Sequence, residues 1–112
     1  MADDCIFCKI ANHVIESDYV YEDDLVCAFR DMNPAAPTHV LVIPKAHYDC
    51  AADAPEELLG YMVSVAAKIA KAEGIEESGY RFVINTGADG GQSVKHLHLH
   101  LLGGRSMQWP PG

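Results

Sequence analysis

The arrangement of apolar and polar residues along the chain predicts one long helix. Apolar side chains recur with the spacing of a helix over residues 54–73. Asp53 and Glu56 form an acidic variant of the capping box at its start, with Pro55 in the first turn. Gly74 follows the last turn, where glycine commonly ends a helix. These signals agree on where the long helix begins and ends.

Shorter runs of β-branched, aromatic and aliphatic residues predict strands. The acidic segment 22–24 separates the first two runs and indicates a hairpin. A short helix over 5–12, capped by Asp4, precedes them. The five expected strands cover 19–21, 25–30, 39–43, 80–86 and 97–102. Strands that are mostly adjacent in sequence, with one long and one short helix, indicate an α+β fold with a five-stranded, largely antiparallel sheet.

Composition narrows the class of protein. The 112 residues form one domain over 1–112, and the hydrophobic fraction of 49% is that of an ordinary globular chain. Eight basic against sixteen acidic residues give a net charge of −8, which argues against nucleic-acid binding. No apolar run reaches the length of a membrane span, so no membrane partner is expected. The acidic start, 1–4, is unlike a secretory signal, and we expect a cytoplasmic protein.

The segment His96-Leu97-His98-Leu99-His100-Leu101 alternates with a period of two. In a strand this places three imidazoles on one face and three leucines on the other, so the leucines are expected in the core. The first and third histidines would lie about 13 Å apart along the strand. A single metal ion held by all three is therefore not expected.

A glycine-rich loop, 87–91, leads into this strand and ends in Gln92 and Ser93. Exposed N–H groups in such a loop can form a concavity for an anion, although a plain hairpin loop has the same composition. The loop matches neither the P-loop nor the dinucleotide-binding glycine pattern. Glycines, a hydroxyl group and three histidines together indicate phosphoryl or nucleotidyl transfer.

These residues make the sequence similar to a known family. The segment 90–102 resembles the histidine triad (HIT) signature, in which three histidines alternate with apolar residues. The segments 30–34, 36–39, 42–45 and 103–112 resemble the nucleotide-binding (Hint) branch of that family. The resemblance implies a homodimer whose sheets join edge to edge. It also implies binding of purine nucleoside monophosphates and hydrolysis of their amides.

The resemblance assigns roles to individual residues. His98 corresponds to the nucleophile that forms a covalent nucleotidyl intermediate, with His100 and Ser93 contacting the phosphate and the leaving group. Asp31 corresponds to the acceptor for the ribose hydroxyls, and Met32 to an apolar contact with the nucleoside. The expected catalytic residues are His98, Ser93, His100 and His96. The expected nucleotide-binding residues are Asp31, Met32, His39, Asn85, Gly91, Gln92, Ser93, His98 and His100.

Cys5 and Cys8 form a C-x-x-C pair for which three interpretations stand. They are a redox pair, two unrelated buried thiols, or half of a zinc site. Some HIT proteins and the related galactose-1-phosphate uridylyltransferases pair such cysteines with two histidines, which here are His47 and His96. The resemblance therefore implies a structural zinc ion at these four residues. Cys27 and Cys50 are interpreted as ordinary thiols and His13 as a surface residue.

Two other functions remain possible from the sequence. One is a diadenosine polyphosphate hydrolase, against which Ser93 and the Gly103-Gly104-Arg105 segment argue. The other is a nucleotide-binding regulatory module without catalysis, against which the nucleophile, Ser93 and Asn85 argue. For the homodimer, we expect the Trp109-Pro110-Pro111 tail to reach toward the site of the other subunit.

Overall fold

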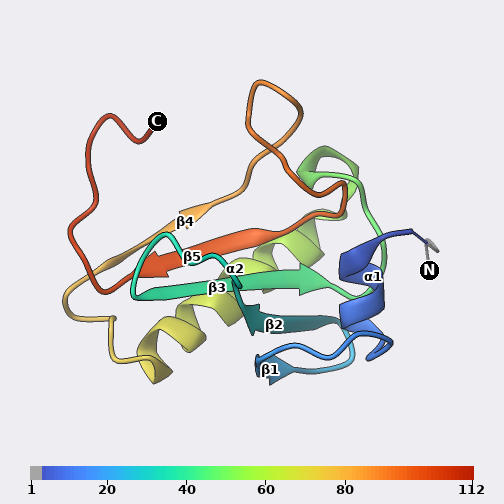
Figure 1. The fold of residues 1–112 in the computed structure, drawn as a ribbon, viewed down its shortest axis with the longest axis horizontal. Helices are drawn as coiled ribbons and strands as arrows, with labels where there is room; N and C mark the ends of the chain where they lie inside the picture. The colour runs from blue at the N-terminus through green and yellow to red at the C-terminus, as the bar shows by residue number, and fades with distance from the viewer. Residues whose placement is uncertain (1–3) are drawn as a thin grey trace.

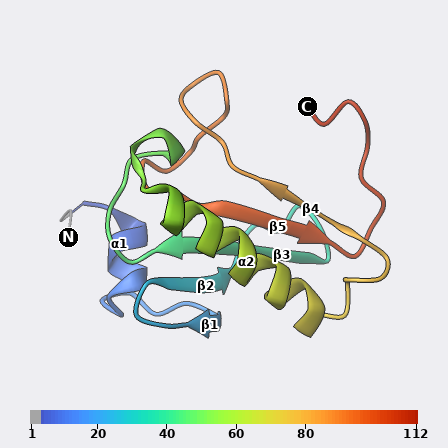
Figure 2. The same ribbon diagram turned by 180° about the vertical axis from the view of Figure 1, so that it is seen from behind.

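A computed structural model describes residues 4–112; the remaining three residues of the acidic start lie outside it. Five strands form one antiparallel sheet in the order β1-β2-β3-β5-β4. Figures 1 and 2 show the long helix α2 across one face of the sheet and the short helix α1 at its end. The elements are α1 (Ile6–Ala11), β1 (Tyr19–Glu22), β2 (Val26–Arg30), β3 (Thr38–Pro44), a 3₁₀ turn (Ala51–Asp53), α2 (Glu56–Ala72), β4 (Tyr80–Val83) and β5 (Leu99–Gly103). The α+β prediction is confirmed.

The two helices cover opposite faces of the central strands. Val26, Ala28, Val40 and Val42 belong to the core under α2, whereas Cys27, Phe29, Leu41 and Ile43 pack with residues of α1. All seven residues of β3 are buried, as its continuous apolar run predicts. No helix within residues 4–112 is long and apolar enough to cross a membrane.

The starts of both helices differ from the prediction. Cys5, not Asp4, is the N-cap of α1, and its Sγ accepts the backbone N–H of Cys8 at 3.3 Å. The capping box of Asp53 and Glu56 does not form, because Asp53 lies in the separate 3₁₀ turn and the N-cap position falls on Pro55. Glu56 and Glu57 instead place negative charge in the first turn of α2, where the helix dipole favours it.

The end of α2 follows the prediction. Gly74 has a φ of +77° and lies directly after the C-cap residue Glu73. Its N–H donates to Lys71 O at 3.1 Å, and the N–H of Ile75 donates to Ala70 O at 3.1 Å. This pair of bonds is the Schellman arrangement, and it requires a left-handed residue at the position that glycine occupies.

The last two strands are shorter than predicted. β4 ends at Val83, which pairs with His100, so residues 84–86 lie outside the sheet. β5 begins at Leu99 instead of residue 97. The neighbouring strand β3 ends at Pro44, which has no N–H to extend the ladder of hydrogen bonds. The N–H of Leu97 donates instead to Tyr48 O at 2.7 Å. His96 and His98 therefore precede the regular strand.

Candidate active site

The alternation of histidine and leucine still separates the two kinds of side chain. Leu97, Leu99 and Leu101 are buried in the core under α2, as predicted. His98 and His100 line a pocket beyond the other face of the sheet, beside α1. The core thus backs the candidate catalytic histidines directly.

His98 is held in one orientation. Its side chain is buried, with the whole residue 3% exposed, and its Nδ1 lies 2.7 Å from the backbone O of His96. A carbonyl oxygen only accepts, so Nδ1 carries the proton and donates it. The ring of Phe7 packs edge-on against the imidazole, with centroids 5.0 Å apart. In the neutral ring this leaves Nε2 with a free lone pair.

His39 and His100 form a second pair, whose tautomers are fixed by the backbone. The N–H of Ala35 donates to His39 Nδ1 at 3.0 Å, so the proton of the neutral His39 ring is on Nε2. That Nε2–H donates to His100 Nδ1 at 2.9 Å. The proton of the neutral His100 ring is consequently on Nε2. Asp31 Oδ2 lies 3.5 Å from His39 Nε2 and adds a negative charge beside the pair.

The pair stays neutral at physiological pH. Burial, together with the neighbouring rings of His98 and His39, lowers the pKa of His100 to about 4. Burial also lowers the pKa of His39, although the charge of Asp31 opposes this. The pair can therefore donate and accept hydrogen bonds at neutral pH without carrying a positive charge.

The pocket beside these histidines has an apolar part and a polar part. Its volume is about 210 Å³. The apolar side chains that line it are Ile6, Phe7, Ile10, Phe29, Met32, Leu41 and Val94, and the polar ones include Ser17, Asp31, Ser93, His98 and His100. Met32 is 91% exposed and Ser93 is also exposed, so both lie at the open side. Such a pocket suits a molecule with a flat apolar part and a polar or charged end.

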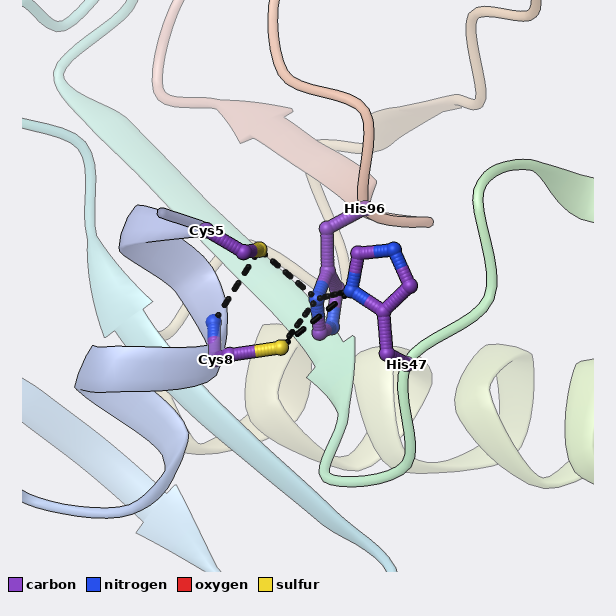
Figure 3. Close-up of side chains that lie close together, drawn as sticks. All are labelled: Cys5, Cys8, His47 and His96. Carbon is purple, nitrogen blue, oxygen red and sulfur yellow. Dashed lines mark hydrogen bonds between the residues drawn. The ribbon is translucent and has the colours of Figure 1, made fainter. Parts of the chain in front are cut away.

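Beside this pocket, Cys5, Cys8, His47 and His96 form a cluster, which we call the cysteine–histidine cluster (Figure 3). The cysteines come from the start of α1, His47 from the loop after β3, and His96 from the segment before β5. His96 Nδ1 lies 3.3 Å from Cys5 Sγ, 3.5 Å from Cys8 Sγ and 3.1 Å from His47 Nδ1. Sulfur and nitrogen ligands of one tetrahedral zinc ion lie about 3.3 to 3.8 Å apart, so the cluster has almost the size of a zinc site.

The outer bonds of the two rings also fit a metal. His96 Nε2 donates to Pro44 O at 2.9 Å, and His47 Nε2 donates to Asp49 Oδ1 at 2.9 Å. Each neutral ring thus presents an unprotonated Nδ1 to the centre of the cluster. Two lone pairs facing each other are stabilised by a cation between them. Ring N–H groups held by a carboxylate or a carbonyl are the usual support of histidine ligands of zinc.

A comparison with known families identifies the architecture. The HIT domain family matches residues 12–107. The chain belongs to this family. The matched region includes residues 84–95, before the histidines, and ends within the tail that follows β5.

Several HIT relatives are similar over nearly their whole length. Purine nucleoside phosphoramidase of Escherichia coli (strain K12) is 54% identical over 110 residues, which cover 96% of this chain and 92% of the relative. A 14 kDa zinc-binding protein of Zea mays is 56% identical over 96% of this chain and 87% of the relative. The crystal structure of a HIT family hydrolase from Legionella pneumophila superimposes with a TM-score of 0.94 at 52% identity, covering 97% of this chain and all of that one. This HIT protein is an enzyme, a hydrolase of its family.

Some residues expected at the nucleotide site of this HIT domain lie away from the pocket. The N–H groups of Gly91 and Gln92 donate within the loop, to Ala88 O and Gly87 O, each at 3.0 Å. The Gln92 side chain bonds the backbone of Gly87, Asp49 and Val94 and thereby braces the loop. Asn85 is half-buried after β4 and is not among the residues that line the pocket. The two loop amides are therefore not free to hold an anion in this conformation.

Other contributors to the site could not be recognised in the sequence. Phe7, Ile10 and Phe29 line the pocket, yet as apolar residues in a helix and a strand they resemble ordinary core positions. Asp49 supports His47 through a side-chain bond, and its position two residues later is a weak signal. Pro44 acts through its carbonyl, which leaves no trace in the identity of the residue.

Proposed function

We propose that the chain hydrolyses the P–N bond of purine nucleoside phosphoramidates through a nucleotidyl intermediate on His98. The observation that carries this proposal is the bond from His98 Nδ1 to the His96 carbonyl, which leaves Nε2 as a nucleophile. A neutral imidazole nitrogen attacks phosphorus with its lone pair and needs to lose no proton first. A serine hydroxyl, by contrast, must give up its proton to a base. The E. coli relative, named a purine nucleoside phosphoramidase, supports the substrate class.

In the first step His98 Nε2 attacks the α-phosphorus. A bond from phosphorus to Nε2 forms, the bond from phosphorus to the amine nitrogen breaks, and its electron pair goes to that nitrogen. The departing amine takes a proton from the Ser93 hydroxyl, and a proton from solvent replaces it on the serine oxygen. His100 Nε2–H donates to a phosphoryl oxygen and compensates part of its charge.

In the second step water attacks the same phosphorus from the opposite side. The bond from phosphorus to His98 Nε2 breaks, the ring regains its lone pair, and the nucleoside monophosphate leaves. The attacking water releases the proton that the first step consumed. Splitting one displacement into two in this way is the general advantage of a covalent intermediate.

The rest of the pocket accounts for nucleotide binding. Phe7, Ile10 and Phe29 supply an apolar surface for the purine. One carboxylate oxygen of Asp31 accepts the N–H of Asn33 at 2.8 Å, which holds the group in place to accept hydrogen bonds from the ribose. We retain Met32, His39, Asn85, Gly91 and Gln92 as expected members of the site. For Gly91 and Gln92, contact with phosphate requires the loop to exchange its internal bonds.

Replacing His98 tests the mechanism. His98→Ala should lower kcat for an adenosine phosphoramidate below about 1% of wild type, a barrier increase of about 3 kcal/mol, and leave adenosine monophosphate binding within about threefold. The control is His13→Ala, which removes an exposed histidine outside the pocket. Trapped nucleotide on His98, found by mass spectrometry after acid-free quenching, would add direct support. Wild-type turnover in His98→Ala would refute the nucleophile, and turnover of dinucleoside polyphosphates alone would refute the substrate class.

We also infer that the cysteine–histidine cluster binds a structural zinc ion. Its donor set, its dimensions and the two unprotonated nitrogens support this, as does the name of the zinc-binding relative from Zea mays. Burial raises the pKa of Cys5, so a thiolate there needs a cation to stabilise it. When bound, the metal ties α1 to the segment that carries His98. The chemistry at phosphorus does not pass through it.

A homodimer is the assembly we propose. One side of β4 has no partner strand within residues 4–112, and an open edge invites pairing with a second copy. Trp109 is 80% exposed in the single chain, where Arg81 lies 5.9 Å from its ring. An apolar tail so exposed supports a contact with the other subunit. Sedimentation at micromolar concentration should give a dimer, and a monomer would overturn the assignment.

A further inference from the structure

A second cavity lies apart from the histidine pocket. It is open to solvent on one side and is bounded by the turn between β1 and β2, the loop after β3 and the first turns of α2. Its volume is about 540 Å³, against about 210 Å³ for the histidine pocket, and the two share no lining residue. A volume of this size is typical of sites for small molecules.

The walls of this cavity are mainly apolar and partly aromatic. Leu25 is 55% exposed, and Leu58 and the ring of Tyr48 also line it. The ring of Tyr61 is fixed, because its hydroxyl donates to Asp23 Oδ2, which also accepts from Tyr21. An apolar group entering the cavity would thus meet an already ordered surface, which lowers the entropic cost of binding.

The charge at the cavity is negative. Asp24 and Glu57 line it, and no lysine or arginine does so within residues 4–112. Carboxylates attract a cation, and so do the faces of tyrosine rings. The same carboxylates disfavour an anion, and a neutral apolar molecule gains nothing from them.

We propose that this cavity binds an organic ammonium ion that carries an aromatic or aliphatic body. The body lies against Leu25, Leu58 and the two tyrosine rings, and the ammonium group lies toward Asp24 and Glu57. The proposal does not depend on the proposed function, since the cavity contains none of the catalytic residues. One residue of the cavity, Tyr48, is nevertheless connected to the segment that carries His98. It follows His47 in the chain, and the carbonyl of Tyr48 accepts the N–H of Leu97, which lies between His96 and His98.

The test compares three probes of nearly the same size. 2-Phenylethylamine is a cation, 2-phenylethanol is neutral and 3-phenylpropionate is an anion at pH 7. Each is titrated into ¹⁵N-labelled full-length protein while backbone amide shifts are followed. The amine should shift the amides of Leu58, Tyr61 and Tyr48 in a saturable manner, ahead of those of Ile10 and Phe29. The alcohol should bind more weakly and the acid least.

Charge-neutral variants make the test specific. The double variant D24N/E57Q should weaken amine binding about fivefold and leave alcohol binding unchanged. The control E76Q/E77Q removes two exposed carboxylates outside the cavity and should leave both unchanged. The proposal is overturned if the three probes bind equally, if D24N/E57Q binds the amine like wild type, or if no shift appears at these amides. The last result would mean that the cavity is closed in solution or covered by a second copy.

Discussion

Two groups of side chains in this molecule each contain two histidines and have the dimensions of a metal site. They differ in the hydrogen bonds that the ring nitrogens facing away from each group make. Asp31, His39 and His100 bring a carboxylate and two imidazoles together, and their ligand atoms lie within 4.8 Å, as those of the cysteine–histidine cluster do. In the cysteine–histidine cluster the outer ring nitrogens donate to acceptors, Pro44 O and Asp49 Oδ1. At His39 the outer nitrogen accepts from the N–H of Ala35.

This one difference distinguishes a group of side chains suited to a metal ion from a pair of rings that share a proton. An outer acceptor takes the ring proton and leaves a lone pair inside, which suits a cation. An outer donor forces the proton to the inner nitrogen, and a metal there would require an anionic ring. This difference supports the proposal of zinc at the cysteine–histidine cluster and of hydrogen-bonded neutral rings at His39 and His100. The comparison teaches that the hydrogen-bonding group behind a histidine, whether backbone or side chain, decides which ring nitrogen carries the proton.

The largest expected effect comes from removing a thiolate from the cysteine–histidine cluster. Cys8→Ser should lower the free energy of unfolding by about 3 kcal/mol or more and reduce bound zinc from about one ion per chain to nearly none. Urea denaturation and elemental analysis measure the two quantities. Cys50→Ser, a half-buried thiol outside the cluster, should change neither. Equal zinc content in Cys8→Ser and wild type would remove the assignment.

A pair of substitutions at His39 tests the proton-bearing role. In His39→Asn the side-chain oxygen can still accept from Ala35, but nothing donates to His100 Nδ1, so His100 loses the tautomer with a proton on Nε2. kcat should fall about 100-fold with zinc content unchanged. His39→Gln places an amide N–H near the position of Nε2 and should recover most of the loss. Equal rates for the two variants would show that the tautomer is not what His39 controls.

A smaller effect on zinc affinity is expected at Asp49, which accepts a hydrogen bond from the proposed zinc ligand His47. Asp49→Asn weakens the acceptor behind His47 and should lower zinc affinity about tenfold in a chelator competition. Asp31→Asn, which alters the carboxylate beside His39, should leave zinc affinity unchanged. If the two variants lose zinc equally, the distinction between the two groups is wrong.

The smallest effect concerns pH. Burial depresses the pKa of His100 from 6.5 to about 4, so between these values the unfolded chain binds a proton at this residue that the folded chain does not. The free energy of unfolding should therefore decrease as the pH falls from about 6.5 to about 4. Denaturation of wild type and His100→Asn across this window should show a shallower slope in the variant. The effect is modest because the side chain is half-buried and water screens its charge.

The sequence predicts the fold more fully than the site. Three predictions agree with the structure: the helical spacing of α2, its end at Gly74 and the burial of the alternating leucines. The first and the third rest on many apolar residues that must all be buried on one face. The predicted caps at Asp4 and Asp53 were wrong, because the Cys5 thiol accepts the N–H of Cys8 and Asp53 lies in a separate 3₁₀ turn before α2. Resemblance to the family supplied the four cluster residues that the structure brings together. The tautomers of His39, His96 and His98 depend on a backbone N–H or backbone carbonyl oxygens, which leave no trace in the sequence pattern.

The alternation of core leucines and pocket histidines has a consequence for local opening. Leu97 and Leu99 are almost completely buried under α2, and they flank His98 in the chain. His98 therefore cannot swing out of place unless the core beneath it also separates. Amide hydrogen exchange at 97–101 should then proceed only through global unfolding, with protection near the maximum for the molecule, whereas the loop at 87–92 should exchange rapidly. The residue that we propose as the nucleophile is therefore expected in the slowest-exchanging unit of the protein, and ligand binding should not require that unit to open.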